Sequence, residues 1–153
     1  MEQTARAAQA RGLTSALLNI GGNVRAIGTK TGGKPWTAGC RRTPGAIDPA
    51  YIQAVELADG DSLVISGDYQ RYFEYDGVRY AHLIDLTTGY PARYVSSVAV
   101  LARADTGDLA DALSTGLFCL PEETGQALAA QNHYAVLWMH PDETTSQSAD
   151  WPQ

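Results

Sequence analysis

Cysteine is scarce in this sequence, and so are long apolar stretches. The 153 residues include two cysteines, Cys40 and Cys119, which form neither a Cys-x-x-Cys pair nor a cluster with histidine. This spacing argues against a zinc site and leaves two interpretations open, a disulfide or two buried free thiols. No apolar run approaches the roughly 18 residues that a membrane-spanning helix needs. We therefore expect neither a structural zinc ion nor a membrane-spanning segment.

Positive charge is also in short supply. Lys and Arg number 11 against 17 Asp and Glu, which gives a net charge of -6. Nucleic-acid-binding domains usually present a basic face, so we expect no nucleic-acid partner. A phosphorylated ligand would need local positive charge from a metal ion, an arginine or oriented N–H groups. Residues 1–12 lack the apolar core of a signal peptide, and on this segment alone we expect a cytoplasmic protein, which leaves the localisation open.

Hydrophobic and turn residues alternate in a way that predicts one mixed domain over residues 1–141. Apolar or aromatic runs bounded by turn residues predict strands over 16–20, 24–29, 36–41, 51–57, 62–66, 72–75, 78–83, 96–102 and 134–139. Helices are predicted over 2–11, from a cap at Asp105 or Thr106 to 120, and over 121–130. The polar residues 142–153 predict a flexible tail. This order indicates an α+β fold, with a largely antiparallel sheet and helices packed on one face.

The stretch from 108 to 120 combines an apolar stripe with two oxygen-bearing side chains. Four leucines recur at helical spacing and are expected in the core: Leu109, Leu113, Leu117 and Leu120. Asp111 and Thr115 are four residues apart, which places them one turn apart on one helix face. A carboxylate and a hydroxyl are hard oxygen ligands that suit Mg²⁺. The alternative is a capping Asp111 and a Thr115 hydroxyl that bonds back to the carbonyl four residues earlier.

A histidine and an aspartate lie in an extended segment that precedes a Thr88-Gly89-Tyr90-Pro91 turn. In extended backbone His82 and Ile84 share one face, while Leu83 and Asp85 share the other. His82 could act as a general base or bind phosphate, or it could be a structural histidine at a strand end.

A third stretch, residues 66–71, follows a predicted buried strand. Gly67 permits close backbone approach at that point. Arg71 is a residue type that binds phosphate or carboxylate. By themselves these residues do not indicate a particular function.

Five stretches occur in a fixed order: Asn19-Ile20-Gly21-Gly22-Asn23, Ser66-Gly67-Asp68-Tyr69, His82-Leu83-Ile84-Asp85-Leu86-Thr87-Thr88-Gly89, Ser97-Val98-Ala99-Val100 and Asp111-Ala112-Leu113-Ser114-Thr115. In this order and spacing they resemble the second half of the FAD:protein FMN transferases, the ApbE family, over roughly residues 13–141. The resemblance implies a Mg²⁺-dependent enzyme that cleaves the pyrophosphate of FAD, attaches FMN to a Thr or Ser hydroxyl of a partner flavoprotein, and releases AMP. Some relatives instead hydrolyse FAD to FMN and AMP.

The resemblance also suggests roles for individual residues. Asp111 and Thr115 match the metal ligands of the family's Asp-Ala-x-x-Thr helix. His82 matches the active-site histidine of its His-Ile-x-Asp-Pro-x-Thr-Gly motif, and Asp85 joins it as a second expected catalytic residue. The residues expected to bind the flavin substrate are His82, Thr88, Gly89, Ser97 and Gly67. Leu86 stands where the family usually has proline, which predicts a softer turn.

The match does not reach the family's N-terminal half, whose Ala-Lys-Gly-Tyr-Ala-like motif supplies a backbone metal ligand and part of the FAD pocket. We therefore expect a partial domain, with little activity unaided and with exposed apolar surface that favours a homodimer. Two alternatives to an enzyme stay open. One is a non-catalytic flavin- or metal-binding module, or a half-domain that needs a partner chain, and the other is a purely structural domain. Family members are often periplasmic or lipoprotein-anchored.

Overall fold

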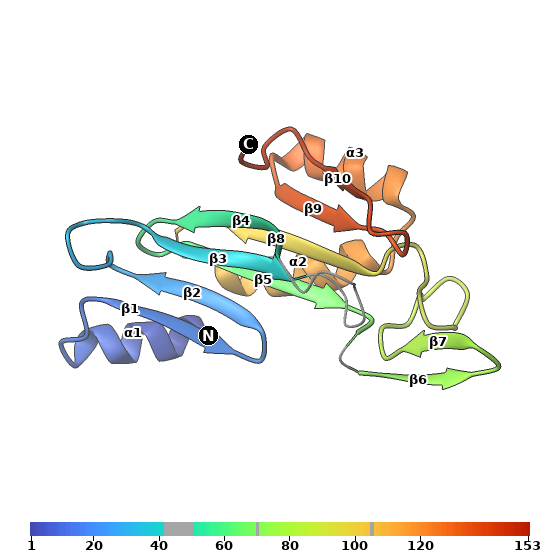
Figure 1. Cartoon of the computed structure of the whole chain (residues 1–153), viewed down its shortest axis with the longest axis horizontal. Coiled ribbons are helices and arrows are strands. Elements are labelled where there is room, and N and C mark those ends of the chain that lie inside the picture. Colours follow the sequence, from blue (N-terminus) through green and yellow to red (C-terminus); the bar gives the residue numbers. More distant parts are fainter. Residues whose placement is uncertain (42–50, 70, 105) are drawn as a thin grey trace.

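Six strands form one antiparallel sheet in the computed structural model, which describes residues 1–41, 51–69, 71–104 and 106–153 (Figure 1). The strand order is β1-β2-β5-β8-β9-β10, and each neighbouring pair is antiparallel. The strands are β1 (Ala16–Ile20), β2 (Asn23–Ile27), β5 (Ser62–Gly67), β8 (Ser97–Ala102), β9 (Ala135–Met139) and β10 (Thr145–Gln147). The predicted α+β class with a largely antiparallel sheet is confirmed.

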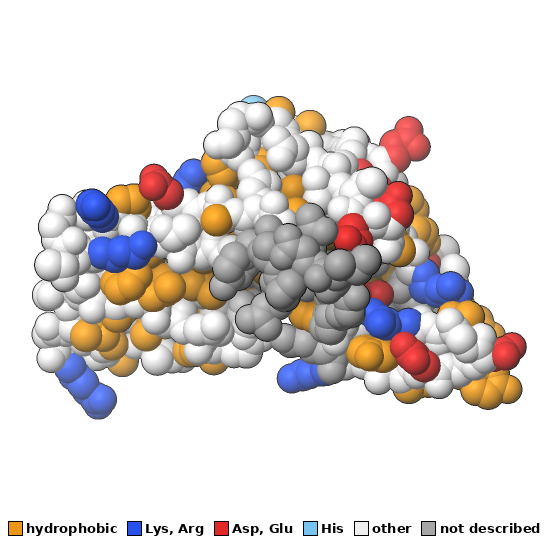
Figure 2. Space-filling view, in the orientation of Figure 1, with side chains coloured by type: hydrophobic (Ala, Val, Ile, Leu, Met, Phe, Trp, Pro, Cys, Tyr) orange, Lys and Arg blue, Asp and Glu red, His pale blue; other side chains and the backbone are white. Residues whose placement is uncertain are grey.

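Two hairpins complete the described strands. One pairs β3 (Trp36–Arg41) with β4 (Tyr51–Leu57), and the other pairs β6 (Tyr72–Tyr75) with β7 (Val78–Ala81). The predicted loop over 42–49 lies outside the described residues. Asp76 and Gly77 both have positive φ, 51° and 72°, as the two-residue turn predicted from Asp-Gly requires. The β6–β7 hairpin projects from the sheet at the lower right of Figures 1 and 2 and exposes aromatic side chains.

The central strands separate two apolar cores because alternate side chains point to opposite faces of a sheet. On one face Val98, Val100 and Trp138 pack with the helices α2 (Gly107–Phe118) and α3 (Glu122–Asn132). Met1, which directly precedes α1 (Glu2–Ala10), packs against the same core, and α1 contacts β2. On the other face Ala99 and Leu101 pack with the β3–β4 hairpin. The helices therefore cover one face, as predicted, and a hairpin covers the other. None of the helices in the described ranges is both long and apolar enough to cross a membrane.

The buried side of α2 differs from the predicted leucine stripe. Leu117 is buried, but Leu109 is 50% exposed, and the buried positions also include Gly107, Ala110 and Ser114. Small residues at these positions let the helix backbone approach the sheet closely. A Cβ at Gly107 would lie 2.8 Å from Ser62 Oγ. Close packing of the helix therefore selects the small side chains for the interior and turns Leu109 outward.

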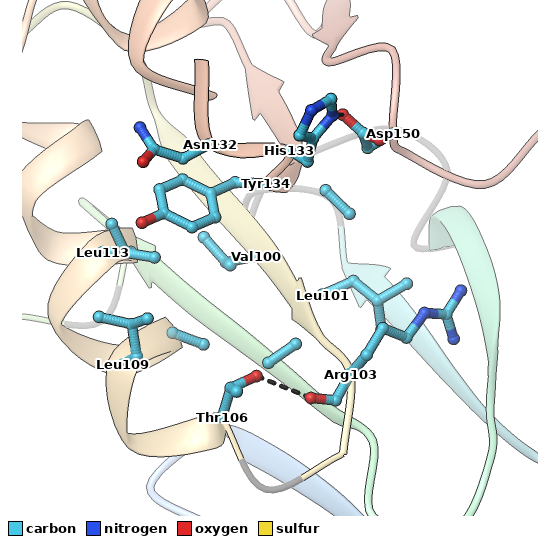
Figure 3. Close-up of a pocket in the computed structure, with 13 residues that line it drawn as sticks. Val100, Leu101, Arg103, Thr106, Leu109, Leu113, Asn132, His133, Tyr134 and Asp150 are labelled. Atoms are coloured by element: carbon cyan, nitrogen blue, oxygen red, sulfur yellow. Dashed lines mark hydrogen bonds and ion pairs between the residues drawn. The ribbon is translucent and has the colours of Figure 1, made fainter. Parts of the chain in front are cut away.

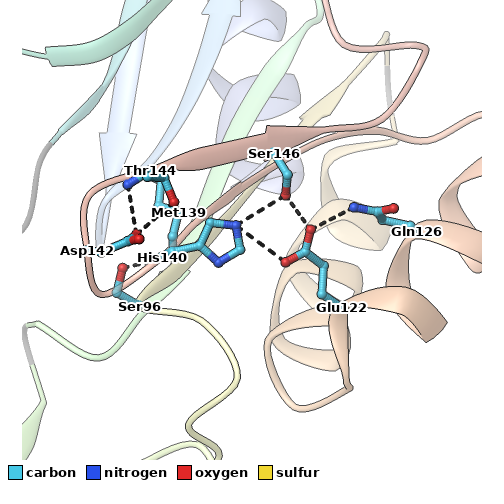
Figure 4. Close-up of polar contacts among 8 residues, drawn as sticks. All are labelled: Ser96, Glu122, Gln126, Met139, His140, Asp142, Thr144 and Ser146. Atoms are coloured by element: carbon cyan, nitrogen blue, oxygen red, sulfur yellow. Dashed lines mark hydrogen bonds and ion pairs between the residues drawn. The ribbon is translucent and has the colours of Figure 1, made fainter.

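The C-terminal segment is not the flexible tail that its polar composition predicts. β10 pairs with β9, and Trp151 is 2% exposed, with its Nε1 donating a hydrogen bond to Gln53 Oε1 at 3.0 Å. Ser146 of β10 donates a hydrogen bond to Glu122 of α3, and Glu122 also lies 3.4 Å from His140 Nε2 (Figure 4). Burial of one large aromatic side chain, together with this polar cluster, orders a segment in which most residues are hydrophilic.

Both cysteines are free thiols, so the disulfide interpretation is wrong, but only Cys40 is buried and Cys119 is half-buried. Cys40 is buried within the core beneath the β3–β4 hairpin. Burial raises the pKa of its thiol to about 12. The Cys40 thiol is therefore protonated and unreactive at neutral pH.

A buried ion pair connects the first helix to the sheet. Arg25 Nη1 lies 2.6 Å from Glu2 Oε1, and both side chains are 3% exposed. The same nitrogen donates a hydrogen bond to the Gly60 carbonyl at 2.7 Å. Because charged groups out of contact with water need a partner, this pair fixes α1 against β2.

Replacing Glu2 with alanine should lower the free energy of unfolding by about 3–5 kcal/mol, because it leaves the Arg25 charge buried without its carboxylate. Urea unfolding followed by circular dichroism measures this difference. Glu123→Ala, at an exposed position of α3, is the control and should change stability by no more than about 0.5 kcal/mol. Equal effects of the two substitutions would show that the buried pair contributes nothing specific.

Candidate functional site

A polar cleft lies where β5 ends, beside the β1–β2 turn, α2 and the base of the β6–β7 hairpin. Its volume is about 190 Å³. Eleven residues line it: Gly21, Asn23, Ile65, Ser66, Gly67, Tyr69, Arg71, His82, Leu83, Asp111 and Thr115. Four of the predicted site residues, distant in sequence, therefore meet here: Gly67, His82, Asp111 and Thr115.

Asp111 lies inside α2 and points into the cleft. It is the fifth residue of the helix, so it does not cap the N-terminus. Asn23 Nδ2, from the first residue of β2, donates a hydrogen bond to Asp111 Oδ1 at 2.9 Å. This contact joins two segments separated by 88 positions, and the position of Asp111 within α2 rules out the capping alternative.

Thr115 lies one helical turn after Asp111 and takes part in a chain of hydroxyl groups. Its Oγ1 is 3.2 Å from Ser66 Oγ, which in turn lies 2.8 Å from Ser114 Oγ. The side chain that bonds back to the Asp111 carbonyl is Ser114, at 3.1 Å. The hydroxyl of Thr115 therefore faces β5 and the cleft, and does not make the helical back-bond of the alternative interpretation.

The two exposed oxygens of Asp111 and Thr115 fit a Mg²⁺ ion in their chemistry, since Mg²⁺ prefers oxygen ligands and retains several waters. Within the described ranges no group of three or more His, Cys, Asp and Glu side chains could hold a metal. A Mg²⁺ ion bound here would have one oxygen each from Asp111 and Thr115 as side-chain ligands. Water and substrate oxygens would complete its coordination.

His82 follows β7 directly and is held by the residue that precedes β6. Its backbone N–H donates to the Arg71 carbonyl at 3.1 Å, and its Nδ1 lies 3.2 Å from the same oxygen. A carbonyl oxygen only accepts hydrogen bonds, so Nδ1 carries the hydrogen. In the neutral ring Nε2 is then the nitrogen that can accept a proton. Arg71 also lines the cleft.

Gly67 lines the cleft, whereas Ser97 lies beneath it. A Cβ at Gly67 would lie 2.5 Å from the Tyr69 ring and 3.0 Å from Ser97 Cβ, so no larger residue fits without movement. Ser97 is 1% exposed and donates a hydrogen bond to Met139 Sδ at 3.3 Å. The structure therefore places Ser97 as packing support for Gly67, outside the cleft lining.

Asp85, Thr88 and Gly89 form a separate turn that does not line the cleft. Asp85 Oδ1 accepts a hydrogen bond from the Thr87 N–H at 2.8 Å, and Oδ2 accepts bonds from Thr88 Oγ1 at 3.1 Å and Tyr94 Oη at 2.9 Å. Gly89 has a φ of +73°. The predicted face pattern is confirmed, with Leu83 and Asp85 buried and His82 and Ile84 exposed. These contacts make Asp85 the organiser of the turn next to His82.

Leu86, at the position where the resemblance leads one to expect proline, is 94% exposed. The turn around it is held by the hydrogen bonds to Asp85 and does not depend on packing of the Leu86 side chain. The predicted softening of this turn stays a prediction.

The Asp85 turn should weaken in acid. Hydrogen bonds from the Thr87 amide and the Tyr94 hydroxyl lower the pKa of the Asp85 carboxyl. A lowered folded-state pKa gives stability that is present above the unfolded pKa and is lost as the pH falls through the folded value. The difference in unfolding free energy between the unaltered protein and Asp85→Asn should thus shrink below about pH 4. Urea unfolding across this range measures it, and a difference that does not vary with pH would contradict the assignment.

Sequence reasoning gave no role to two residues of the cleft, Asn23 and Ser66. Both lie inside stretches that carry the family resemblance, next to glycines that mark turns or close approach. Their hydrogen bonds to Asp111, Ser114 and Thr115 depend on strand pairing, which a single sequence does not specify. The feature of the sequence that could have indicated them is the position of each polar side chain directly beside a glycine.

A larger groove of about 470 Å³ lies between α2 and the ends of β8 and β9 (Figure 3). Leu109, Leu113 and Tyr134 line it, and Thr106 Oγ1 donates to the Arg103 carbonyl at its edge at 2.7 Å. It contains none of the predicted site residues. Chemistry therefore points to the smaller, polar cleft as the candidate site.

Proteins similar to this chain are described as FAD:protein FMN transferases. The protein of that name from Vibrio cholerae serotype O1 is 40% identical over 131 residues, which cover 84% of this chain and 38% of the relative. The one from Rhodobacter capsulatus is 41% identical over 125 residues, 80% of this chain and 22% of the relative. The chain thus spans less than half the length of these curated relatives.

Solved structures give the same result at the level of the fold. The crystal structure of the ApbE protein from Thermotoga maritima superposes with a TM-score of 0.84 at 33% identity, covering 97% of this chain and 47% of that one. The flavin transferase ApbE from Vibrio cholerae gives a TM-score of 0.81 at 32% identity, covering 98% and 47%. The profile of the ApbE family matches residues 1–138. The chain therefore belongs to the ApbE family.

Proposed function

We propose that this chain provides the metal and phosphate site of a flavin transferase, which moves the FMN part of FAD to a Thr or Ser hydroxyl of an acceptor flavoprotein and releases AMP. The observation that carries the proposal is the meeting of Asp111, Thr115 and His82 in one polar cleft. The names of the relatives support FAD as the substrate and a protein as the acceptor. Dependence on Mg²⁺ and release of AMP are part of the proposal.

The reaction requires one phosphorus–oxygen bond to form and one to break. The acceptor hydroxyl oxygen attacks the phosphorus on the FMN side of the pyrophosphate, and the bond to the AMP phosphate breaks with its electron pair on AMP. When bound, Mg²⁺ would neutralise charge on the pyrophosphate and on the leaving phosphate. Such neutralisation is needed in a chain of net charge -6.

His82 would accept the hydroxyl proton through Nε2, because Nδ1 is occupied by the Arg71 carbonyl. Arg71 also lines the cleft, and its guanidinium would bind phosphate oxygens. Asp85 stays outside the reacting atoms and holds the turn that follows His82. Thr88 and Gly89 contribute through the same turn, and Gly67 admits the substrate close to the backbone.

A second candidate function is a flavin- and metal-binding half that turns over FAD only with a further segment or chain. The observation that favours it is size: the cleft holds about 190 Å³, whereas pockets that enclose drug-sized ligands measure about 300–1,000 Å³. FAD would therefore contact additional protein surface. A homodimer that completes the pocket across its interface belongs to this proposal, and light scattering tests it.

Incubation of the chain with FAD, Mg²⁺ and a threonine-containing acceptor peptide distinguishes these functions, with nucleotides followed by chromatography and the peptide by mass spectrometry. A flavinylated peptide with equimolar AMP supports transfer, and FMN plus AMP without flavinylation indicates hydrolysis. Mg²⁺-dependent FAD binding without turnover supports the half-site function. Absence of any Mg²⁺-dependent interaction with FAD would contradict the proposal.

A further inference from the structure

We infer that Asn23 and Ser66 are positioning residues. They orient the two proposed metal ligands, Asp111 and Thr115, so that oxygen lone pairs of these ligands are available to a cation in the cleft. The inference rests on the proposed function and identifies what supports its ligands. Each positioning residue belongs to a different sheet strand, and both ligands belong to α2. These contacts therefore join α2 to the sheet at each of the two side chains that would bind the cation.

The hydroxyl chain around Ser66 has one consistent direction, because each hydroxyl has a single hydrogen. Ser114 donates its hydrogen to the Asp111 carbonyl. In the contact between Ser66 and Ser114, at 2.8 Å, Ser66 must then be the donor. Ser66 has no second hydrogen, so Thr115 is the donor in the 3.2 Å contact between Thr115 and Ser66.

This direction matters for metal binding by Thr115. A hydroxyl binds a cation through an oxygen lone pair, and its hydrogen must point elsewhere. Because Ser66 accepts that hydrogen, the lone pairs of Thr115 Oγ1 are left for a ligand in the cleft. A Ser66 without its hydroxyl would free the Thr115 side chain to rotate and to direct its hydrogen to the Asp111 carbonyl, as threonines in helices commonly do.

Asn23 acts on the other ligand. Its amide is turned so that Nδ2 meets Asp111 Oδ1 at 2.9 Å, and the opposite orientation would place two oxygens in contact. Asn23 is itself fixed, since it pairs with Ile20 across a turn in which Gly21 and Gly22 have φ values of 64° and 94°. Within the described part of the chain Asp111 Oδ2 accepts no hydrogen bond. One carboxylate oxygen is therefore anchored while the other is available.

Fixed ligands should matter here because Mg²⁺ demands near-ideal octahedral geometry and gives up water reluctantly. Only two side-chain oxygens are offered, and both belong to exposed residues that would otherwise rotate freely. Loss of a group that orients a metal ligand typically weakens metal affinity by about 10- to 100-fold.

The test is a titration of the 153-residue chain with Mn²⁺ alone, which prefers the same oxygen ligands and is detected by electron paramagnetic resonance. Asn23→Ala and Ser66→Ala should each raise the Mn²⁺ dissociation constant by about 10-fold or more. Ser66→Thr, which keeps the hydroxyl, should restore it. The matched controls Asn132→Ala and Ser15→Ala lie outside the cleft and should bind as the unaltered protein does.

Two further readouts separate positioning from a general structural role. The metal-free melting temperature of Asn23→Ala and Ser66→Ala should stay within about 4 °C of that of the unaltered protein. In a Thr115→Ala background, which keeps Asp111, Ser66→Ala should have no additional effect on Mn²⁺ binding, because the hydroxyl that it orients is already absent.

The outcomes also separate this inference from the proposed function. Loss of Mn²⁺ binding in Asp111→Asn, with unchanged affinity in Asn23→Ala and Ser66→Ala, would overturn the positioning roles and leave the metal site standing. Equal binding by the unaltered protein and Asp111→Asn, or none by either, would overturn the metal site and the positioning roles with it.

Discussion

Replacing Asp111 with asparagine should reduce Mg²⁺-dependent AMP release from FAD by about 100- to 1,000-fold. A metal that stabilises charge on a phosphate contributes several kcal/mol, and each 1.36 kcal/mol corresponds to about tenfold in rate. Asparagine keeps the size of the side chain and an oxygen that can accept the Asn23 hydrogen bond. It removes the charge that attracts the cation, so the fold should stay intact while metal-dependent turnover is lost.

The matched control is Asp108→Asn, which removes the same charge from the same helix at an exposed position outside the cleft. It should retain activity within a few-fold, because only the helix N-terminal charge interaction is affected. Circular dichroism confirms that both variants fold. An Asp111→Asn protein that releases AMP at the rate of the Asp108→Asn control would contradict the metal assignment.

The second large effect is expected at His82. His82→Ala should lower turnover by about 10²- to 10⁴-fold, the usual contribution of general acid–base catalysis, with a much smaller change in the KM for FAD. The reason is that Nε2 would act on the proton of the attacking hydroxyl and not on the bound flavin. A residue that only binds phosphate would instead raise KM.

A pH profile gives the independent test of this role. A reaction that uses a general base has a rate that depends on pH, and this dependence should be absent in His82→Ala. His133→Asn is the control, since asparagine tolerates the left-handed backbone of this exposed residue, whose φ is 55°. If His82→Ala keeps both the rate and the pH profile, His82 is a structural residue at the end of β7.

Local patterns predicted most elements of this fold correctly, because strand alternation and turn chemistry are short-range properties. The Asp76-Gly77 hairpin is the clearest example, since two adjacent residues carry the required backbone geometry. Predictions failed where a single long-range contact outweighed composition. Burial of Trp151 in the core beneath the β3–β4 hairpin orders the polar C-terminal segment. In α2, close packing of small residues against the sheet turns Leu109 outward.

The sequence indicates the side chains that we propose as metal ligands, but it does not indicate the residues that contact them. The one-turn spacing of Asp111 and Thr115 is a property of a single helix, so the sequence contains it. The contacts of Asn23 and Ser66 arise only when β2 and β5 pair in a particular register. Asp85 shows the converse: its motif was recognised, but its side chain bonds to its own turn and does not enter the cleft.

The central claim is that Asp111, Thr115 and His82 form one metal-dependent site for the pyrophosphate of FAD. The most direct measurement is a crystal structure of this chain with FAD and Mn²⁺, with the ion located by its anomalous scattering. The account predicts one peak about 2.0–2.3 Å from both Asp111 and Thr115 Oγ1, close to the range for oxygen-bound Mg²⁺, with the pyrophosphate beside His82. A peak elsewhere, or FAD bound away from this cleft, would contradict it.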